Sequence, residues 1–231
     1  MSVIDSLRVM GAMGRISVPI VVDMLRGKLA RQQVDDAARW YAHRVVELLD
    51  IDLVATGAER VPQGRAYVYM SNHQSHMDIP ILYATLPSPT IRMLAKKELF
   101  AIPIWGKGLR AAEFIEVDRA NHVRAIQSID RAKELIRDGV SVWLAAEGTR
   151  SFDGRIGPLK KGGFHLATET ATPIVPVAIR GTIEILKRGT KAMHRGKHVE
   201  VTIGAPIAVE GRSMDSLADE VRSFLISNVE R

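Results

Sequence analysis

The chain has no cysteine. This absence excludes disulfides, thiolate nucleophiles and cysteine metal ligands, and it fits a reducing compartment. Only 5% of the residues are aromatic, and no base-stacking platform or recognition-helix motif occurs, so a nucleic-acid partner is not expected. The seven histidines are scattered without the H-E-x-x-H or similar spacing of a metal site, so we expect no bound metal.

Long apolar runs are also missing. No stretch approaches the ~18 uncharged apolar residues that a membrane-spanning helix requires. Asp5, Arg8 and Arg15 interrupt the amino-terminal apolar stretch, so it does not read as a secretory signal. Any membrane association is therefore expected to be peripheral or monotopic.

What is present is an ordinary globular composition, with 46% apolar and 25% charged residues among 231. This length suits one domain with a substantial core and a small appendage. The formal net charge of +6 indicates an anionic partner, either an anionic membrane surface or phosphorylated substrates.

Residues 1–50 are predicted to form an amphipathic helical hairpin. In residues 1–28 the charged residues recur at helical spacings and share one narrow face, while the rest of the circumference is apolar. Such a helix can lie in a membrane interface, or it can dock on its own domain or on a second subunit. Pro19 is expected to kink or split it. A second helix is predicted over residues 34–49.

Residues 51–231 alternate strand and helix patterns, which predicts an α/β domain: a mixed, mostly parallel sheet flanked by helices. Strands are expected at 53–56, 66–71, 91–95, 113–117, 140–146, 174–179 and 199–203. Helices are expected to begin near Ile79, to run over 121–138 with Gly139 as the stop, and to run over 214–228. Pro176 argues for an edge strand or a bulge in 174–179.

The turn Asn72-His73-Gln74-Ser75-His76-Met77-Asp78 follows the second predicted strand. On a loop, unlike on a helix, side chains five residues apart can meet. Asp78 can then cap the next helix and accept a proton from one nitrogen of His73. The other nitrogen faces outward as a base, and the substrate itself supplies the hydroxyl nucleophile. A histidine that merely satisfies a turn is the alternative.

Three further stretches offer groups for anions at strand ends. Glu147-Gly148-Thr149-Arg150-Ser151 combines a glycine for close approach, two hydroxyls and a guanidinium fork. Lys160 and Lys161 lie in a glycine-rich turn that opens a helix, and Arg119 ends the strand 113–117. The alternatives are solvated loops and, for Arg119, an ion pair with Asp118 or a neighbouring carboxylate.

Taken in order, these blocks resemble the glycerolipid acyltransferases, most closely the 1-acylglycerol-3-phosphate acyltransferases. The histidine turn resembles the N-H-x4-D block of that family, 114–119 its second block, 147–151 its E-G-T-R-S block and 174–179 its proline-containing fourth block. The resemblance spans residues 54–204. Two departures line the site: Ala145-Ala146 replaces the usual Phe-Pro, and Glu116-Val117 stands where a shorter form is common.

The resemblance implies transfer of an acyl group from acyl-CoA or acyl-carrier protein to the sn-2 hydroxyl of 1-acyl-sn-glycerol 3-phosphate, giving phosphatidic acid on the cytoplasmic face of a membrane, with no other cofactor. His73 would be the general base and Asp78 its orienter. The phosphate would be held by Arg119 and Arg150, joined by Lys160 or Lys161. Glu147 would orient an arginine or bond a glycerol hydroxyl, His76 would be a spectator, and backbone N–H groups of the histidine turn would stabilise the oxyanion.

Two alternatives stay open at this point. One is the same chemistry on another acceptor, such as glycerol 3-phosphate or a lyso-aminolipid. The other is a lipid-binding protein without turnover.

Overall fold

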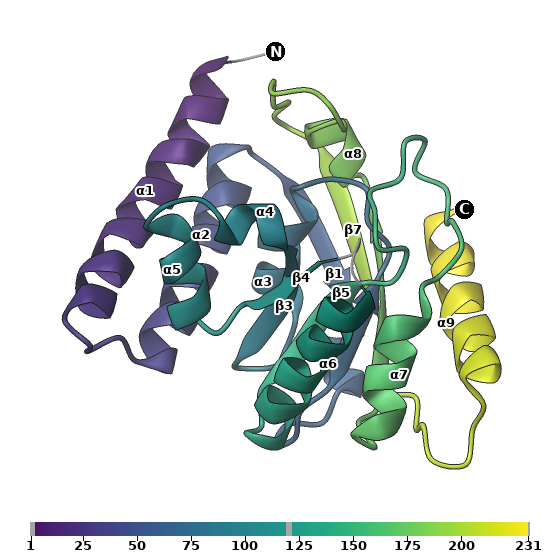
Figure 1. Cartoon of the computed structure of the whole chain (residues 1–231). Coiled ribbons are helices and arrows are strands. Elements are labelled where there is room, and N and C mark those ends of the chain that lie inside the picture. The colour runs from purple at the N-terminus through teal and green to yellow at the C-terminus, as the bar shows by residue number, and fades with distance from the viewer. Residues whose placement is uncertain (1–2, 119–121, 231) are drawn as a thin grey trace.

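Seven strands form one mixed sheet in the computed structural model, which describes residues 3–118 and 122–230 (Figure 1). The order across the sheet is β1-β7-β6-β2-β5-β3-β4, and all neighbours are parallel except β6 and β7. All the predicted strands are present, and their ends are shifted by at most two residues. They are β1 (Asp52–Thr56), β2 (Val68–Ser71), β3 (Ile91–Lys96), β4 (Ile115–Val117), β5 (Ser141–Ala145), β6 (Ile174–Arg180) and β7 (His198–Ile203).

Helices cover both faces of this sheet, with α1 to α3 on one side and α6, α7 and α9 on the other (Figure 1). A short 3-10 turn spans Ala58–Arg60. The α-helices are α1 (Val3–Leu25), α2 (Arg31–Leu48), α3 (Asp78–Thr85), α4 (Lys97–Phe100), α5 (Trp105–Ala111), α6 (His122–Arg137), α7 (Lys161–Glu169), α8 (Thr182–Ile185) and α9 (Met214–Val229). The short helices α4, α5 and α8 were not expected, because so few turns leave no periodicity to detect.

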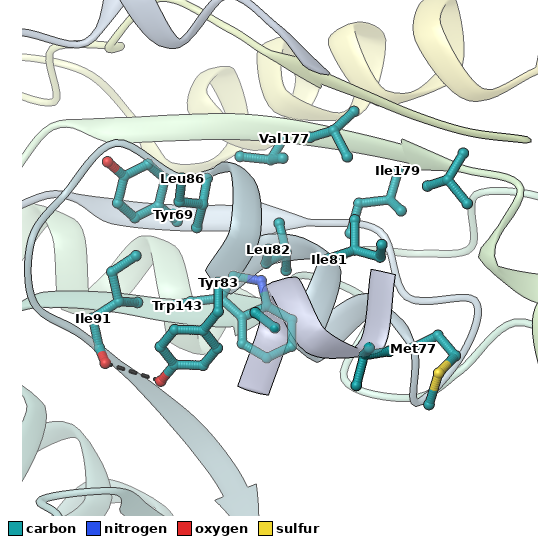
Figure 2. Packing of buried hydrophobic residues seen from close by; sticks show 14 of the residues in the cluster. Tyr69, Met77, Ile81, Leu82, Tyr83, Leu86, Ile91, Trp143, Val177 and Ile179 are labelled. Carbon is teal, nitrogen blue, oxygen red and sulfur yellow. Dashed lines mark hydrogen bonds between the residues drawn. The ribbon is translucent and has the colours of Figure 1, made fainter. Parts of the chain in front are cut away.

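Alternating side chains of the strands build two cores. In β2, Val68 and Met70 face the cluster that α6, α7 and α9 cover, whereas Tyr69 faces the cluster beneath α3. Figure 2 shows part of this second cluster, in which Ile81 of α3 lies with apolar side chains from β2, β3, β5 and β6. The period of two along a strand makes both faces of the sheet apolar, as a sheet between two helical layers requires.

The end of α6 confirms the predicted helix stop. Gly139 has a φ of +79°, the left-handed conformation that glycine adopts without strain. Its N–H donates to the carbonyl of Ile136, and the N–H of Val140 donates to that of Leu135. These two bonds satisfy carbonyls that the helix leaves open, and the chain then enters β5.

The prediction that Pro176 marks an edge strand is wrong, whereas the alternative, a bulge, is confirmed. β6 pairs with β2 on one side and with β7 on the other. The ladder with β7 begins only at Val177, and the carbonyl of Pro176 still accepts a hydrogen bond from Gly204. Antiparallel pairing resumes at Ile174 with Ile207, one residue out of the register of Val177 with Ile203. The chain opposite Pro176 therefore carries one extra residue, as in a bulge.

The amino-terminal helices form the predicted hairpin, and α1 continues through Pro19 without a break. The charged strip of α1 does not lie wholly in solvent, because Asp5 is buried and bonds Arg8. Besides Arg8 and Arg15, the helix exposes large apolar side chains, with Ile4, Leu7, Met10, Val18 and Leu25 each at least 60% exposed. Within the described residues, no helix combines the length and the apolar character needed to cross a bilayer.

The second hairpin helix is joined to the sheet by buried charge. Asp35 of α2 accepts from the guanidinium of Arg92 on β3, and both side chains are at most 4% exposed. The hydroxyl of Thr90 donates to the same carboxylate. Val45 and Leu49 are fully buried in the core that also contains Val199. Helix α2 therefore packs as part of the α/β core.

Candidate active site

The carboxyl ends of three parallel strands bring the predicted site together. Ser71, at the end of β2, pairs with Ala145 of β5 on one side and with Val177 of β6 on the other. The histidine turn 72–78, the loop 146–160 and the residues after β6 therefore meet at one edge of the sheet. Ligand sites in α/β folds occupy this edge.

His73 and Asp78 are in direct contact, as predicted. The imidazole Nδ1 lies 2.7 Å from the carboxylate Oδ2, and the side chain of His73 is 15% exposed while that of Asp78 is fully buried. The rings of His73 and Trp143 pack edge to face, with 6.4 Å between their centroids. When Nδ1 carries the proton and donates a hydrogen bond to Asp78, Nε2 keeps its lone pair and can act as a base.

Four donors hold the carboxylate of Asp78. Besides His73, the backbone N–H groups of Gln74 and Ser75 donate to Oδ2, at 2.8 and 3.0 Å, and the hydroxyl of Thr182 donates to Oδ1. The carboxylate thus bonds the turn before it and caps no N–H of helix α3, contrary to our prediction. Since bonds to an ionised carboxylate are stronger than those to a neutral group, this set fixes the orientation of Asp78.

The turn is also fastened to distant strands. Asn72 donates to the carbonyl of Ile179 and accepts from its N–H, both at 2.8 Å. The hydroxyl of Ser75 donates to the carbonyl of Leu186. Asn72 and Ser75 are both fully buried, so breaking these bonds would leave buried polar groups without partners.

Glu147 has a different role from either of the two that we expected. Its Oε2 accepts from the N–H of His73 at 3.0 Å, and its Oε1 accepts from the N–H of Gly157 at 2.8 Å. Burial raises the pKa of the Glu147 carboxyl, and these two N–H bonds oppose the shift. The side chain therefore links the histidine turn to the segment before α7.

The loop after β5 runs beside the histidine turn. The N–H of Ser151 donates to the carbonyl of His73 at 2.8 Å. Gly148 has a φ of +69°, which favours glycine. Thr149 is exposed, and Arg150 is half-buried. Burial, followed by the positive charge of Arg188, lowers the pKa of the Arg150 guanidinium.

The predicted cations reach different places. The side chain of Lys160 lies against Gly148, where an added Cβ would meet its Cγ at 3.2 Å. The ammonium of Lys161 instead lies 3.6 Å from Asp215 on α9. Arg119 lies outside the described residues. Its neighbour Asp118 is paired with Lys97 at 2.9 Å.

The predicted oxyanion donors are mostly engaged elsewhere. The N–H groups of residues 73, 74, 75, 77 and 78 all donate to acceptors within the chain. The expectation that this turn stabilises an oxyanion is therefore wrong for those five donors.

His76 lies on the same turn, but its imidazole is not one of the four groups that bond Asp78. Partial burial and the positive charge of Arg150 lower the pKa of His76.

Thr182 and Trp143 are the contacts of the pair that sequence reasoning missed. Thr182 follows β6 and is 104 residues from the carboxylate that it bonds, so no local pattern could have identified it. Within residues 3–118 and 122–230, no cluster of acidic and imidazole ligands could hold a metal ion. The arrangement is a buried, oriented imidazole with a basic loop beside it, and it can take a proton from a bound hydroxyl.

Comparisons with known proteins identify the family of the chain. A family model described as Acyltransferase matches residues 52–180. A chloroplastic 1-acyl-sn-glycerol-3-phosphate acyltransferase of Brassica napus is 35% identical over 174 residues, which cover 75% of this chain and 49% of that protein. The human 1-acyl-sn-glycerol-3-phosphate acyltransferase alpha is 32% identical over 184 residues, which cover 78% of this chain and 64% of the human protein.

The same relation is seen in three dimensions. The crystal structure of the 1-acyl-sn-glycerophosphate (LPA) acyltransferase PlsC from Thermotoga maritima superposes with a TM-score of 0.83 at 27% identity, covering 98% of this chain and 94% of that one. This match confirms the predicted fold class. The alignments span about half the length of the chloroplast relatives from Brassica napus and Arabidopsis thaliana, at 49% and 48%.

Proposed function

The chain belongs to the acyltransferase family, whose model covers more than half of it, and we propose that it is a 1-acyl-sn-glycerol-3-phosphate acyltransferase. It would transfer a fatty acyl group from acyl-CoA or acyl-carrier protein to the sn-2 hydroxyl and so form phosphatidic acid. The contact between His73 and Asp78 carries this proposal, because it supplies a base and leaves the nucleophile to the substrate. The names of the relatives support the choice of acceptor.

His73 acts as the general base in the proposed reaction. Its Nε2 takes the proton of the sn-2 hydroxyl as that oxygen attacks the thioester carbonyl carbon, forming a tetrahedral intermediate. The intermediate collapses with cleavage of the C–S bond, and the imidazolium returns the proton to the leaving thiolate. Asp78 keeps the imidazole in the required tautomer and stabilises its charged form. No acyl-enzyme is needed, which agrees with the absence of cysteine.

The phosphate of the acceptor binds the loop beside the histidine turn. Arg150 offers a planar fork for phosphate oxygens, and Lys160 passes the same loop at Gly148. Arg119 stays a candidate for the same role, and Lys161 is the weaker candidate because Asp215 already neutralises it. Gly148 and Thr149 border the phosphate through the backbone and a hydroxyl, while Glu147 holds the loops in place through its two backbone contacts.

The enzyme works at the surface of a membrane, on the cytoplasmic face in our proposal. Five apolar side chains of α1 are exposed, and Leu99, Ile102 and Ile104 near α4 and α5 are at least 41% exposed. Helix α1 contacts α5, so these residues lie on neighbouring elements. An apolar helix face of this kind inserts into the headgroup boundary without crossing the bilayer.

Transfer of labelled oleoyl groups from oleoyl-CoA to lysophosphatidate in detergent micelles tests the reaction. We expect phosphatidic acid from the wild type and a loss of about 10² to 10⁴ in rate with His73→Ala, since general-base catalysis contributes that much. His165→Ala is the matched control, because that histidine is exposed on α7 and pairs with Glu169, away from the histidine turn. Equal rates for wild type and His73→Ala would remove His73 from the mechanism.

A further inference from the structure

Arg188 follows helix α8 and lies against the part of loop 146–160 that carries Arg150, which we call the arginine loop. Arg188 belongs to none of the family blocks. Its Nη1 donates to the backbone carbonyl of Arg150 at 2.7 Å. Its guanidinium carbon lies 3.9 Å from the centroid of the Phe152 ring, within the range of a cation–π contact. Both contacts fix the position of the guanidinium, and neither neutralises its charge.

Arg150 and Arg188 therefore present two neighbouring positive charges without an anion. Among residues 3–118 and 122–230, neither guanidinium forms an ion pair with a carboxylate. Burial is the main cause of the lowered pKa of Arg150; the charge of Arg188 lowers it further, and the more distant carboxylate of Asp78 opposes the shift without pairing with either arginine. An arrangement of like charges held by fixed contacts is stabilised when an anion binds between them.

The position of the pair suits the acceptor. The residue after Arg150 donates its N–H to the carbonyl of His73 at 2.8 Å, so the arginine loop and the base are adjacent. In the acceptor, only the C2–C3–O linkage separates the reacting hydroxyl from the phosphorus atom. The phosphate must consequently bind close to His73 whenever the hydroxyl reaches Nε2.

We propose that Arg188 is a substrate-binding residue that, together with Arg150, receives the phosphate monoester of the acceptor and selects it over phosphodiesters. This inference rests on the proposed function. A phosphate monoester carries a charge of about −1.5 to −2 at pH 7 and three terminal oxygens, enough for two guanidinium forks. A phosphodiester carries one charge and two terminal oxygens, so it leaves one of the two forks without a full partner.

Steady-state kinetics of Arg188→Gln with lysophosphatidate and oleoyl-CoA test this role. We expect KM for lysophosphatidate to rise by about tenfold or more, as the loss of a charge-assisted contact predicts, while KM for oleoyl-CoA and kcat change by less than about threefold. Arg188→Lys keeps the charge without the fork and should recover part of the affinity. Lys187→Gln is the matched control, since it removes the same charge from the adjacent exposed residue.

Binding of hexadecyl phosphate, a monoester without an acceptor hydroxyl, provides a readout independent of turnover. Calorimetry should show weaker binding to Arg188→Gln than to the wild type, and little difference between the two for hexadecyl methyl phosphate, the diester. Melting temperatures identify any variant that fails to fold, in which case Arg188→Lys decides. Unchanged affinity for the monoester in folded variants would overturn the inference.

Two outcomes separate this inference from its neighbours. A rise confined to the KM for oleoyl-CoA, absent with the 3′-dephospho thioester, would assign Arg188 to the 3′-phosphate of the donor and overturn its assignment to the acceptor. If the wild type makes no phosphatidic acid but Arg188→Gln still weakens binding of the alkyl phosphate, the proposed acyl transfer fails and the monoester site stands.

Discussion

Replacing Thr182 with valine removes a single hydrogen bond beneath the candidate base. The Thr182 hydroxyl donates to Oδ1 of Asp78, and both side chains are fully buried. Valine has nearly the volume of threonine, so the substitution leaves no cavity to relax. Oδ1 would lose its donor, while the bonds of Oδ2 to His73, Gln74 and Ser75 stay in place.

The expected cost follows from the charge of the acceptor. Hydrogen bonds to charged groups contribute about 1.5 to 3 kcal/mol, and no water can replace the hydroxyl at a fully buried site. For a chain of 231 residues, each kcal/mol lowers the melting temperature by about 2 to 4 °C, so we expect a decrease of about 3 to 12 °C. Because the orienter is loosened while the base is kept, kcat/KM should fall by about tenfold, less than on removing His73.

Thr182→Ser is the matched control. It keeps the hydroxyl and loses only a methyl group, worth about 0.8 kcal/mol of burial, so it should be the more stable and the more active variant although it is less apolar. Differential scanning calorimetry and initial rates with both variants make the comparison. If Thr182→Val is as stable and active as Thr182→Ser, the hydroxyl does not support Asp78 and the reasoning is refuted.

Three further predictions concern other parts of the molecule. Asp35→Asn should lower the free energy of unfolding in urea by about 3 kcal/mol, because the buried guanidinium of Arg92 loses its closer carboxylate and keeps the longer contact with Glu113. The exposed neighbour Asp36→Asn should change the free energy of unfolding by less than about 0.5 kcal/mol. Leu7→Glu on α1 should reduce flotation of the protein with phosphatidylglycerol vesicles. Val54→Glu on β1, where the replaced side chain is also exposed and apolar, should not. Equal losses of vesicle binding in both variants would argue against α1 as the membrane contact. Hydrogen bonds that His198 donates to the carboxylates of Asp52 and Glu200 raise its pKa. The stabilisation that His198 provides relative to His198→Gln should therefore be full below about pH 6.5 and vanish as the pH rises through the raised pKa; parallel pH profiles of unfolding would contradict this.

Most of the fold could be predicted from local patterns in the sequence. Strand positions followed from short apolar runs, and the end of α6 followed from Gly139, because each depends on residues close in sequence. Pro176 predicted an edge strand wrongly for the opposite reason. Whether the bulge at this proline lies on an edge strand or inside the sheet depends on the strand that pairs beyond it, near Gly204, and a local rule about proline contains no such information.

In the candidate site, too, contacts between residues close in sequence could be predicted and contacts between distant residues could not. His73 and Asp78 lie on one turn, so their contact could be predicted from spacing alone. The role of Glu147 could not, since its two acceptor oxygens are used by N–H groups 74 and 10 residues away. A carboxylate beside an arginine in sequence reads as its ion-pair partner, whereas the fold directs it inward to the backbone. Thr182 was missed because it lies 104 residues from Asp78, and no sequence pattern indicates such a contact before the arrangement of the strands is known.

The pairing of β1 sets an order of events during synthesis. Within the described residues this strand pairs only with β7, and Asp52 is separated from its partner His198 by 146 residues. At about 5 to 20 residues per second on a ribosome, β1 waits about 7 to 30 seconds for its neighbour. The hairpin that precedes it can pack on α3 and β3 earlier, but its core is complete only once β7 is made, because its buried residues also share that core with β7. A nascent chain stopped before β7 would therefore expose apolar surface at its amino-terminal end, where a membrane or a chaperone would be the first to meet it.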